Sequence, residues 1–215
     1  MNGQTPQRTR LWRFFQTVFR VITSRMFDLK VYGRENLPKN GGALLLSNHQ
    51  SYLDPVVIAV KLDRPVSYMA KTELFEGNRI FAWFITALHA FPVRRGESDI
   101  AAVKKAIAKL QEGNILNMYP EGTRSPDGEL GKILPGVVVV VRRAQVPVIP
   151  VAIVGSREAW PKGAKGINSH PVRVMYGKPL NIEGLKGDQI LELIDKTMRG
   201  MLKQLRSGQF TPETN

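Results

Sequence analysis

Two short polar stretches of this chain hold residue types that can transfer a proton and bind an anion. In the first, His49 lies five positions before Asp54; in the second, Glu121 and Arg124 lie on either side of Gly122. A carboxylate bonded to Nδ1 of a histidine fixes its tautomer and leaves Nε2 free as a base. Gly122 lets the backbone approach a ligand closely, and a guanidinium can hold a phosphate. Together the stretches predict the chemistry of acyl transfer to a phosphorylated alcohol.

Each stretch also has a purely structural interpretation. Asp54 precedes a proline, as at many helix starts, so it could be only an N-cap and His49 only a loop residue. Residues 121–124 could be a β-turn with a surface ion pair. Arg94 and Arg95, which follow another apolar segment, could be a second phosphate clamp or a basic loop.

Ser51 is the alternative nucleophile within the first stretch. The Gly-x-Ser-x-Gly pattern of a nucleophile elbow does not surround it. We therefore expect direct transfer from donor to acceptor, without a covalent enzyme intermediate, rather than a Ser-His-Asp hydrolase.

Composition narrows the class of protein. The 215 residues, 43% of them hydrophobic, are enough for one domain with a substantial core. The chain has no cysteine, and its three histidines are scattered, so neither a disulfide framework nor a metal site is expected. The net charge of +13 predicts a polyanionic partner, which could be nucleic acid, an anionic membrane or phosphorylated substrates.

The N-terminal segment, residues 1–28, is predicted to associate with a membrane. Its first 27 residues contain five arginines and no acid. Apolar residues recur there at helical spacing: Leu11, Trp12, Phe15, Phe19, Ile22 and Met26. An amphipathic helix of this composition is typical of a membrane interface, although it could instead pack on the domain with solvated arginines. No uncharged run reaches the roughly 18 residues that a spanning helix needs.

Strand-like and helix-like segments alternate along the rest of the chain. Strands are expected at 29–33, 43–47, 66–70, 90–93, 115–119, 148–154 and 172–176, and helices at 54–62, 73–88, 98–111 and 188–205. Residues 137–141 are five valines, which favour a strand, but their flanks favour a short buried helix, and we favour the helix. The pattern predicts one α/β domain, residues 29–206, with a mostly parallel central sheet flanked by helices, followed by a disordered tail at 207–215.

This order of elements would place His49 just beyond the carboxyl end of a buried strand. Open α/β sheets form their sites at that edge. His49 and Asp54 could not meet on one helix face, so they require a strand–turn–helix junction to come together.

Four blocks of the sequence occur in the order found in the glycerolipid acyltransferases, which this chain resembles over about residues 30–180. The blocks are Asn48-His49-Gln50-Ser51-Tyr52-Leu53-Asp54, Phe91-Pro92-Val93-Arg94-Arg95, Tyr119-Pro120-Glu121-Gly122-Thr123-Arg124-Ser125 and Val146-Pro147-Val148-Ile149-Pro150-Val151. The first and third blocks are the specific ones. The chain looks most like the bacterial 1-acylglycerol-3-phosphate acyltransferases.

The resemblance implies roles for individual residues. His49 would be the base and Asp54 its orienting partner, with Asn48 and Ser51 in secondary positions. The glycerophosphate site would be formed by Arg95, in preference to Arg94, and by Glu121, Gly122, Thr123 and Arg124.

The resemblance also implies the substrates. Acyl-CoA or acyl carrier protein would donate the acyl group to lysophosphatidic acid in phospholipid biosynthesis, with no cofactor or metal, at the cytoplasmic face of the cell membrane. The acceptor could instead be glycerol 3-phosphate or another lysolipid. A basic module that binds anionic lipid or nucleic acid is the non-enzymatic alternative, and nucleic acid is disfavoured because the aromatic residues cluster in apolar helices.

Overall fold

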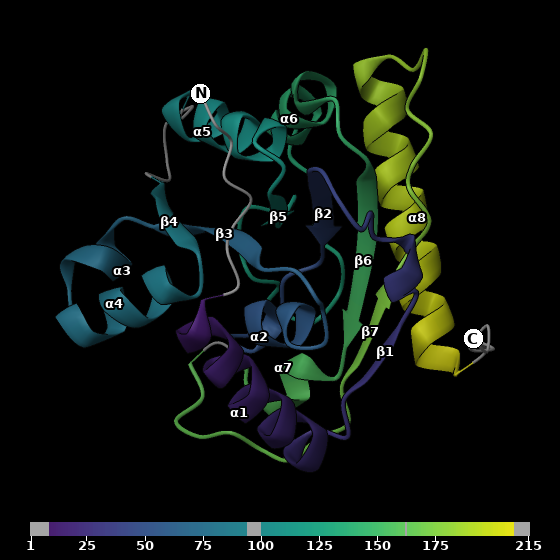
Figure 1. Ribbon diagram of the computed structural model, residues 1–215. Coiled ribbons are helices and arrows are strands. Elements are labelled where there is room, and N and C mark those ends of the chain that lie inside the picture. The colour runs from purple at the N-terminus through teal and green to yellow at the C-terminus, as the bar shows by residue number, and fades with distance from the viewer. Residues whose placement is uncertain (1–8, 94–99, 162, 209–215) are drawn as a thin grey trace.

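The computed structural model describes residues 9–93, 100–161 and 163–208 (Figure 1). Within them, seven strands form one sheet in the order β1-β7-β6-β2-β5-β3-β4. The strands are β1 (Lys30–Tyr32), β2 (Ala43–Ser47), β3 (Val66–Lys71), β4 (Ala90–Val93), β5 (Ile115–Met118), β6 (Val148–Val154) and β7 (Arg173–Tyr176). All neighbouring strands are parallel except β6 and β7. This confirms the predicted α/β domain with a mostly parallel sheet.

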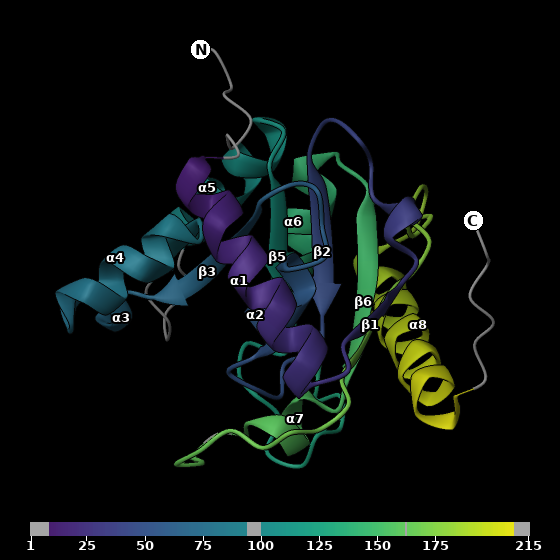
Figure 2. The same ribbon diagram turned by 60° about the horizontal axis from the view of Figure 1, so that its bottom comes forward.

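Helices cover both faces of the sheet. They are α1 (Arg10–Met26), α2 (Asp54–Ala59), α3 (Glu73–Glu76), α4 (Arg79–Ala87), α5 (Ile100–Gln111), α6 (Gly136–Ala144), α7 (Ser156–Ala159) and α8 (Gly187–Ser207), with a 3-10 turn η1 at Arg34–Asn36. One core cluster joins the sheet to α5, α6 and α8, and the other joins it to α2 and the chain after α1. Figure 2 shows α1 across one face of the sheet, with α6 and α8 behind it.

The central strand β2 explains why both faces need covering. All five of its residues are buried. Leu44 and Leu46 pack into one core cluster, whereas Ala43 and Leu45 pack into the other, as the alternation of side chains along a strand requires. A continuous apolar run is therefore stable here only because the sheet is sandwiched.

The predicted helix at residues 137–141 is confirmed. Val137, Val140, Val141 and Ala144 are buried, at helical spacing, against α5 and α8. Gln145 then ends the helix in the left-handed conformation, with φ of 53°. Packing of this stripe outweighs the strand preference of valine.

The predicted single helix at 73–88 is wrong, because the structure has two helices, α3 and α4, in its place. Gly77 separates them in a non-helical conformation, with φ of −82° and ψ of −114°. α4 leaves Ile80 and Trp83 exposed, by 78% and 54%. Figure 1 shows the pair at the β4 edge of the sheet, away from α8.

Helix α1 has two apolar faces, and the predicted stripe contains parts of both. Trp12 is buried and Phe19 packs on the core, while Gln16 donates a hydrogen bond from Nε2 to the carbonyl of Leu62 at 2.5 Å. The exposed apolar side chains form a different stripe: Leu11, Phe14, Val18, Val21, Ile22 and Met26. The helix is thus docked on the domain and still presents an apolar face outward. None of the described helices is both long and apolar enough to cross a bilayer.

Some predicted boundaries lie outside the described residues. These are the helix start at 98–99, residues 1–8 of the N-terminal segment and residues 209–215 of the tail. Ser207, the first residue of the predicted tail, is the last residue of α8.

Candidate active site

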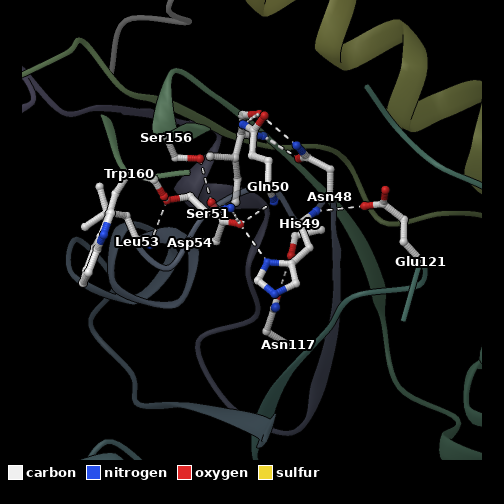
Figure 3. A network of polar contacts seen from close by, with 12 residues as sticks. Asn48, His49, Gln50, Ser51, Leu53, Asp54, Asn117, Glu121, Ser156 and Trp160 are labelled. Atoms are coloured by element: carbon white, nitrogen blue, oxygen red, sulfur yellow. Dashed lines mark hydrogen bonds and ion pairs between the residues drawn. The ribbon is translucent and has the colours of Figure 1, made fainter. Parts of the chain in front are cut away.

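The loop that follows β2 is anchored to the neighbouring strand β6 by Asn48. Its Nδ2 donates to the carbonyl of Ile153 at 3.0 Å, and its Oδ1 accepts from the Ile153 amide at 2.8 Å. Gln50 adds a second donor, from Nε2, to the same carbonyl at 2.8 Å. Because both flanking side chains bind one point on β6, His49 between them is held at the carboxyl end of the sheet (Figure 3).

Asp54 gathers the loop around one buried carboxylate. Its Oδ2 accepts the amides of Gln50 at 2.7 Å and Ser51 at 2.8 Å and lies 2.8 Å from Nδ1 of His49. Its Oδ1 accepts the hydroxyl of Ser156 at 2.6 Å. A carboxylate that already accepts backbone donors accepts from His49 as well, so Nδ1 carries the proton and Nε2 the lone pair. The predicted His49–Asp54 contact is confirmed.

The expectation that Asp54 caps α2 is wrong. The N-cap is Leu53, and Asp54 is the first helical residue. Its side chain turns back to the preceding loop instead of forward to the helix amides. The helix start therefore serves to aim the carboxylate at His49.

The His49 ring is fixed from a second side. It stacks on the ring of Tyr119, with centroids 3.8 Å apart and planes inclined by 15°. Its side chain is only 12% exposed. Within the described residues, Nε2 of His49 makes no hydrogen bond, so the imidazole is oriented with its basic nitrogen available.

Glu121 joins the two predicted stretches through hydrogen bonds to backbone amides. Its Oε1 accepts the backbone amide of His49 at 2.8 Å, and its Oε2 accepts the amide of Gly131 at 2.7 Å. Burial raises the pKa of this carboxyl, and the two amide donors act in the opposite direction. Both carboxyl oxygens of Glu121 are thus engaged in holding the His49 loop against the 121–131 loop. Its implied role in phosphate binding stays a prediction.

The loop after Glu121 borders a hollow of about 350 Å³. Gly122 has φ of 70°, and a Cβ there would lie 2.7 Å from a methyl of Leu134. Thr123 and Arg124 line the hollow together with Lys132, a second cation. Arg124 also lies over the ring of Tyr52, with 3.8 Å between its Cζ and the ring centroid. Of the predicted residues, Glu121, Thr123 and Arg124 therefore border this hollow, which Asp127 and Glu129 also line, whereas Gly122 makes room for Leu134.

Two predicted residues cannot be placed, and a third has a structural position. Arg94 and Arg95 lie outside the described residues. Ser51 is fully buried; its hydroxyl donates to the carbonyl of Trp160 at 2.6 Å and accepts the amide of Leu53 at 3.0 Å. The hydroxyl therefore fastens the loop, which disfavours Ser51 as a nucleophile.

The sequence reasoning missed Ser156 and Lys132. Ser156 follows Gly155 directly after β6, so a polar residue just beyond a third strand end was the available signal. A Cβ on Gly155 would lie 2.0 Å from the carbonyl of Pro171, which explains why only glycine fits before Ser156. Lys132 carried no such signal, because it lies far along an irregular loop.

A mostly parallel α/β sheet with a His–Asp pair and an arginine-bearing loop at its carboxyl edge has the architecture of an enzyme site. A family model described as Acyltransferase matches residues 28–154. The chain belongs to this acyltransferase family.

Individual relatives and a solved structure agree with the family. The chain is 32% identical over 176 residues to the 1-acyl-sn-glycerol-3-phosphate acyltransferase of Bacillus subtilis, covering 80% of this chain and 83% of that protein. It is also 32% identical over 188 residues to the chloroplastic enzyme LPAT1 of Arabidopsis thaliana, covering 85% of this chain but 52% of that one. It therefore spans about half the length of this plant relative.

A crystal structure of the 1-acyl-sn-glycerophosphate acyltransferase PlsC from Thermotoga maritima superposes with a TM-score of 0.76. The two chains are 24% identical, and the alignment covers 90% of this chain and 79% of that one. This likeness shows a shared fold.

Proposed function

We propose that this protein is a 1-acylglycerol-3-phosphate O-acyltransferase. It transfers a fatty acyl group from acyl-CoA or acyl carrier protein to the 2-hydroxyl of lysophosphatidic acid, giving phosphatidic acid for phospholipid biosynthesis. The observation that carries the proposal is the buried Asp54 carboxylate bonded to His49, whose Nε2 is left available. The names of the relatives supply the substrate class.

The reaction follows from the orientation of the imidazole. Nε2 of His49 removes the proton from the 2-hydroxyl as the oxygen attacks the thioester carbonyl. A carbon–oxygen bond forms, the carbon–sulfur bond breaks, and the imidazolium returns its proton to the leaving thiolate. Asp54 stabilises the imidazolium between these steps. Transfer is direct, in keeping with the engagement of the Ser51 hydroxyl by Trp160.

The phosphate of the acceptor binds at the hollow beside the glycine loop. Arg124 and Lys132 provide positive charge there. Arg95, with Arg94 beside it, remains a predicted contributor from the segment after β4. Asp127 and Glu129 line the same hollow, so we assign the phosphate to its Arg124 side, on the loop that Glu121 bonds to the His49 amide.

The protein acts at an anionic membrane surface, in our proposal at the cytoplasmic face. Helix α1 contacts α4 through the partly buried Phe15, whose ring centroid lies 6.4 Å from that of Trp83. Trp83 and Ile80 extend the exposed apolar face of α1 beyond that helix. Arg13 and Arg20 lie beside it, exposed, on the same helix. Apolar side chains bordered by guanidinium groups match the interface of an anionic bilayer.

The base assignment is tested by His49→Ala. General base catalysis typically contributes ~10²–10⁴-fold, so thiol release from acyl-CoA with lysophosphatidic acid should fall by about that factor. The rate of thiol release should also fall sharply in Asp54→Asn, because the tautomer of His49 is no longer fixed. The matched control is His170→Ala, a partly buried histidine whose Nδ1 lies 3.1 Å from the carbonyl oxygen of Pro171. Near-normal turnover by His49→Ala would refute the assignment.

A further inference from the structure

Arg124 differs from the described arginines that contact the neighbouring residues 126–130. Arg199 and Arg206 are bonded to carboxylates and to backbone carbonyls, and Arg157 donates to the carbonyl of Pro126. Among the described residues, the guanidinium of Arg124 has neither a carboxylate within ion-pair distance nor a hydrogen-bond acceptor. Its one recorded partner there is the ring of Tyr52. Its charge is therefore not neutralised and its N–H donors are available.

The ring of Tyr52 also contacts a second aromatic ring. It contacts the ring of Trp160, with centroids 5.3 Å apart and planes inclined by 45°. Trp160 is tied to the same loop, because its carbonyl accepts the Ser51 hydroxyl and Pro161 forms a β-bridge with Ser51. Tyr52 thus contacts both Trp160 and Arg124, and we call the two rings, Trp160 and Tyr52, the aromatic shelf.

An aromatic partner suits a receptor for an anion better than an acidic partner does. A carboxylate would occupy the N–H fork and cancel the charge that a phosphate must meet. A ring face attracts the cation through its quadrupole and leaves the N–H donors free for a ligand. The Tyr52 ring thus restricts the position of the Arg124 guanidinium and leaves its N–H donors available to bind a phosphate.

The shelf also connects the anion receptor to the base. Tyr52 lies three residues after His49, in the loop that Asp54 and Asn48 hold. Arg124 belongs to the loop that Glu121 joins to His49. Any movement of Tyr52 relative to Arg124 would change the separation between the bound phosphate and Nε2 of His49.

We propose that Tyr52, in contact with Trp160, is a positioning residue that holds Arg124 as the receptor for the acceptor's phosphate group. The inference rests on the proposed function and deepens it, because it assigns phosphate selectivity to a residue in the base's own loop. Tyr52 does not touch the reacting atoms. It acts through Arg124, so its loss weakens recognition of the phosphorylated acceptor and leaves the thioester donor unaffected.

The test compares Tyr52→Leu with the conservative variant Tyr52→Phe, which retains the ring. Tyr52→Leu should raise the KM for lysophosphatidic acid by roughly 3- to 30-fold, the range expected for a lost cation–π contact. The KM for acyl-CoA should stay near that of the wild type, and Tyr52→Phe should behave as the wild type. In an Arg124→Ala background, Tyr52→Leu should add little, because both changes remove one interaction. The ring is 45% exposed, so thermal unfolding should change little.

A binding measurement separates this inference from the proposed function. Glycerol 3-phosphate is titrated calorimetrically into the same variants, with no turnover involved, and its Kd should rise for Tyr52→Leu but not for Tyr52→Phe. The wild type could bind glycerol 3-phosphate more tightly than Tyr52→Leu does and yet fail to acylate lysophosphatidic acid. In that case the proposed function is refuted, whereas the role of Tyr52 and Arg124 in binding phosphate is supported. The receptor is refuted if Tyr52→Leu binds as the wild type does, if the wild type does not bind, or if both KM values rise equally.

Discussion

Asp54 shows how a single residue can organise a site. Its carboxylate is fully buried and accepts four donors, from His49, Gln50, Ser51 and Ser156. Burying an isolated charge is costly, and charge-assisted hydrogen bonds of this number offset the cost. The same bonds link β2, α2 and α7, so the group that orients the base also holds together the elements around it.

We predict that Glu121 positions the His49 loop, and Glu121→Gln tests this. An amide offers one acceptor oxygen where the carboxylate offers two, so either the His49 amide or the Gly131 amide loses its partner. The free energy of unfolding should fall by about 1–3 kcal/mol. As the His49 loop shifts, kcat should fall roughly 10- to 100-fold. Chemical unfolding and thiol-release kinetics measure the two effects.

The control for this variant is Glu129→Gln, the same chemical change at an exposed residue that pairs with Arg206 at 2.8 Å. Exposed ion pairs contribute at most about 1 kcal/mol, so stability and kcat should both stay near the wild type. A Glu121→Gln enzyme with unchanged kcat would show that the loop junction does not position the base.

At the scale of elements, strongly patterned segments were predictable and side-chain links across loops were not. The apolar run of β2 and the alternation of strands and helices defined the sheet, which in turn brought His49 to its edge. The break at Gly77 was missed because the apolar run that starts at Ile80 dominated the prediction, although Glu76-Gly77-Asn78 is the kind of polar, glycine-containing stretch that marks a turn. The bonds of Glu121 to His49 and Gly131 depend on tertiary placement, which spacing along the chain cannot supply.

Helix α1 provides the prediction at this scale. Phe14 is 62% exposed on the apolar face, and Thr17 is exposed on the face between Arg13 and Arg20. Phe14→Glu removes a membrane-inserting ring and should weaken binding to phosphatidylglycerol vesicles roughly ten- to hundredfold. Thr17→Glu adds the same charge without removing apolar surface and should weaken it only about fivefold. Vesicle co-sedimentation measures both, and equal losses would mean that the apolar face does not insert.

At the scale of the molecule, charge and apolar surface are two separable contributions to membrane binding. The net charge of +13 acts at a distance on any anionic surface. The apolar surface of α1 and α4 acts only on contact, and burial of apolar area does not depend on long-range charge. The two contributions should therefore respond differently to salt.

Salt titration of vesicle binding tests this division. Between about 0.1 M and about 1 M salt, the Debye length falls from about 10 Å to about 3 Å, so attraction between the basic chain and phosphatidylglycerol vesicles is largely screened. The wild type should lose most of its affinity over this range and keep a salt-resistant remainder from the apolar faces of α1 and α4. Phe14→Glu should lose most of that remainder, whereas Thr17→Glu should retain it.

On phosphatidylcholine vesicles, which carry no net charge, affinity should be weak and insensitive to salt. Complete release of the wild type at high salt would show that charge alone binds this protein to the membrane, and that the exposed side chains of α1 and α4 have another role.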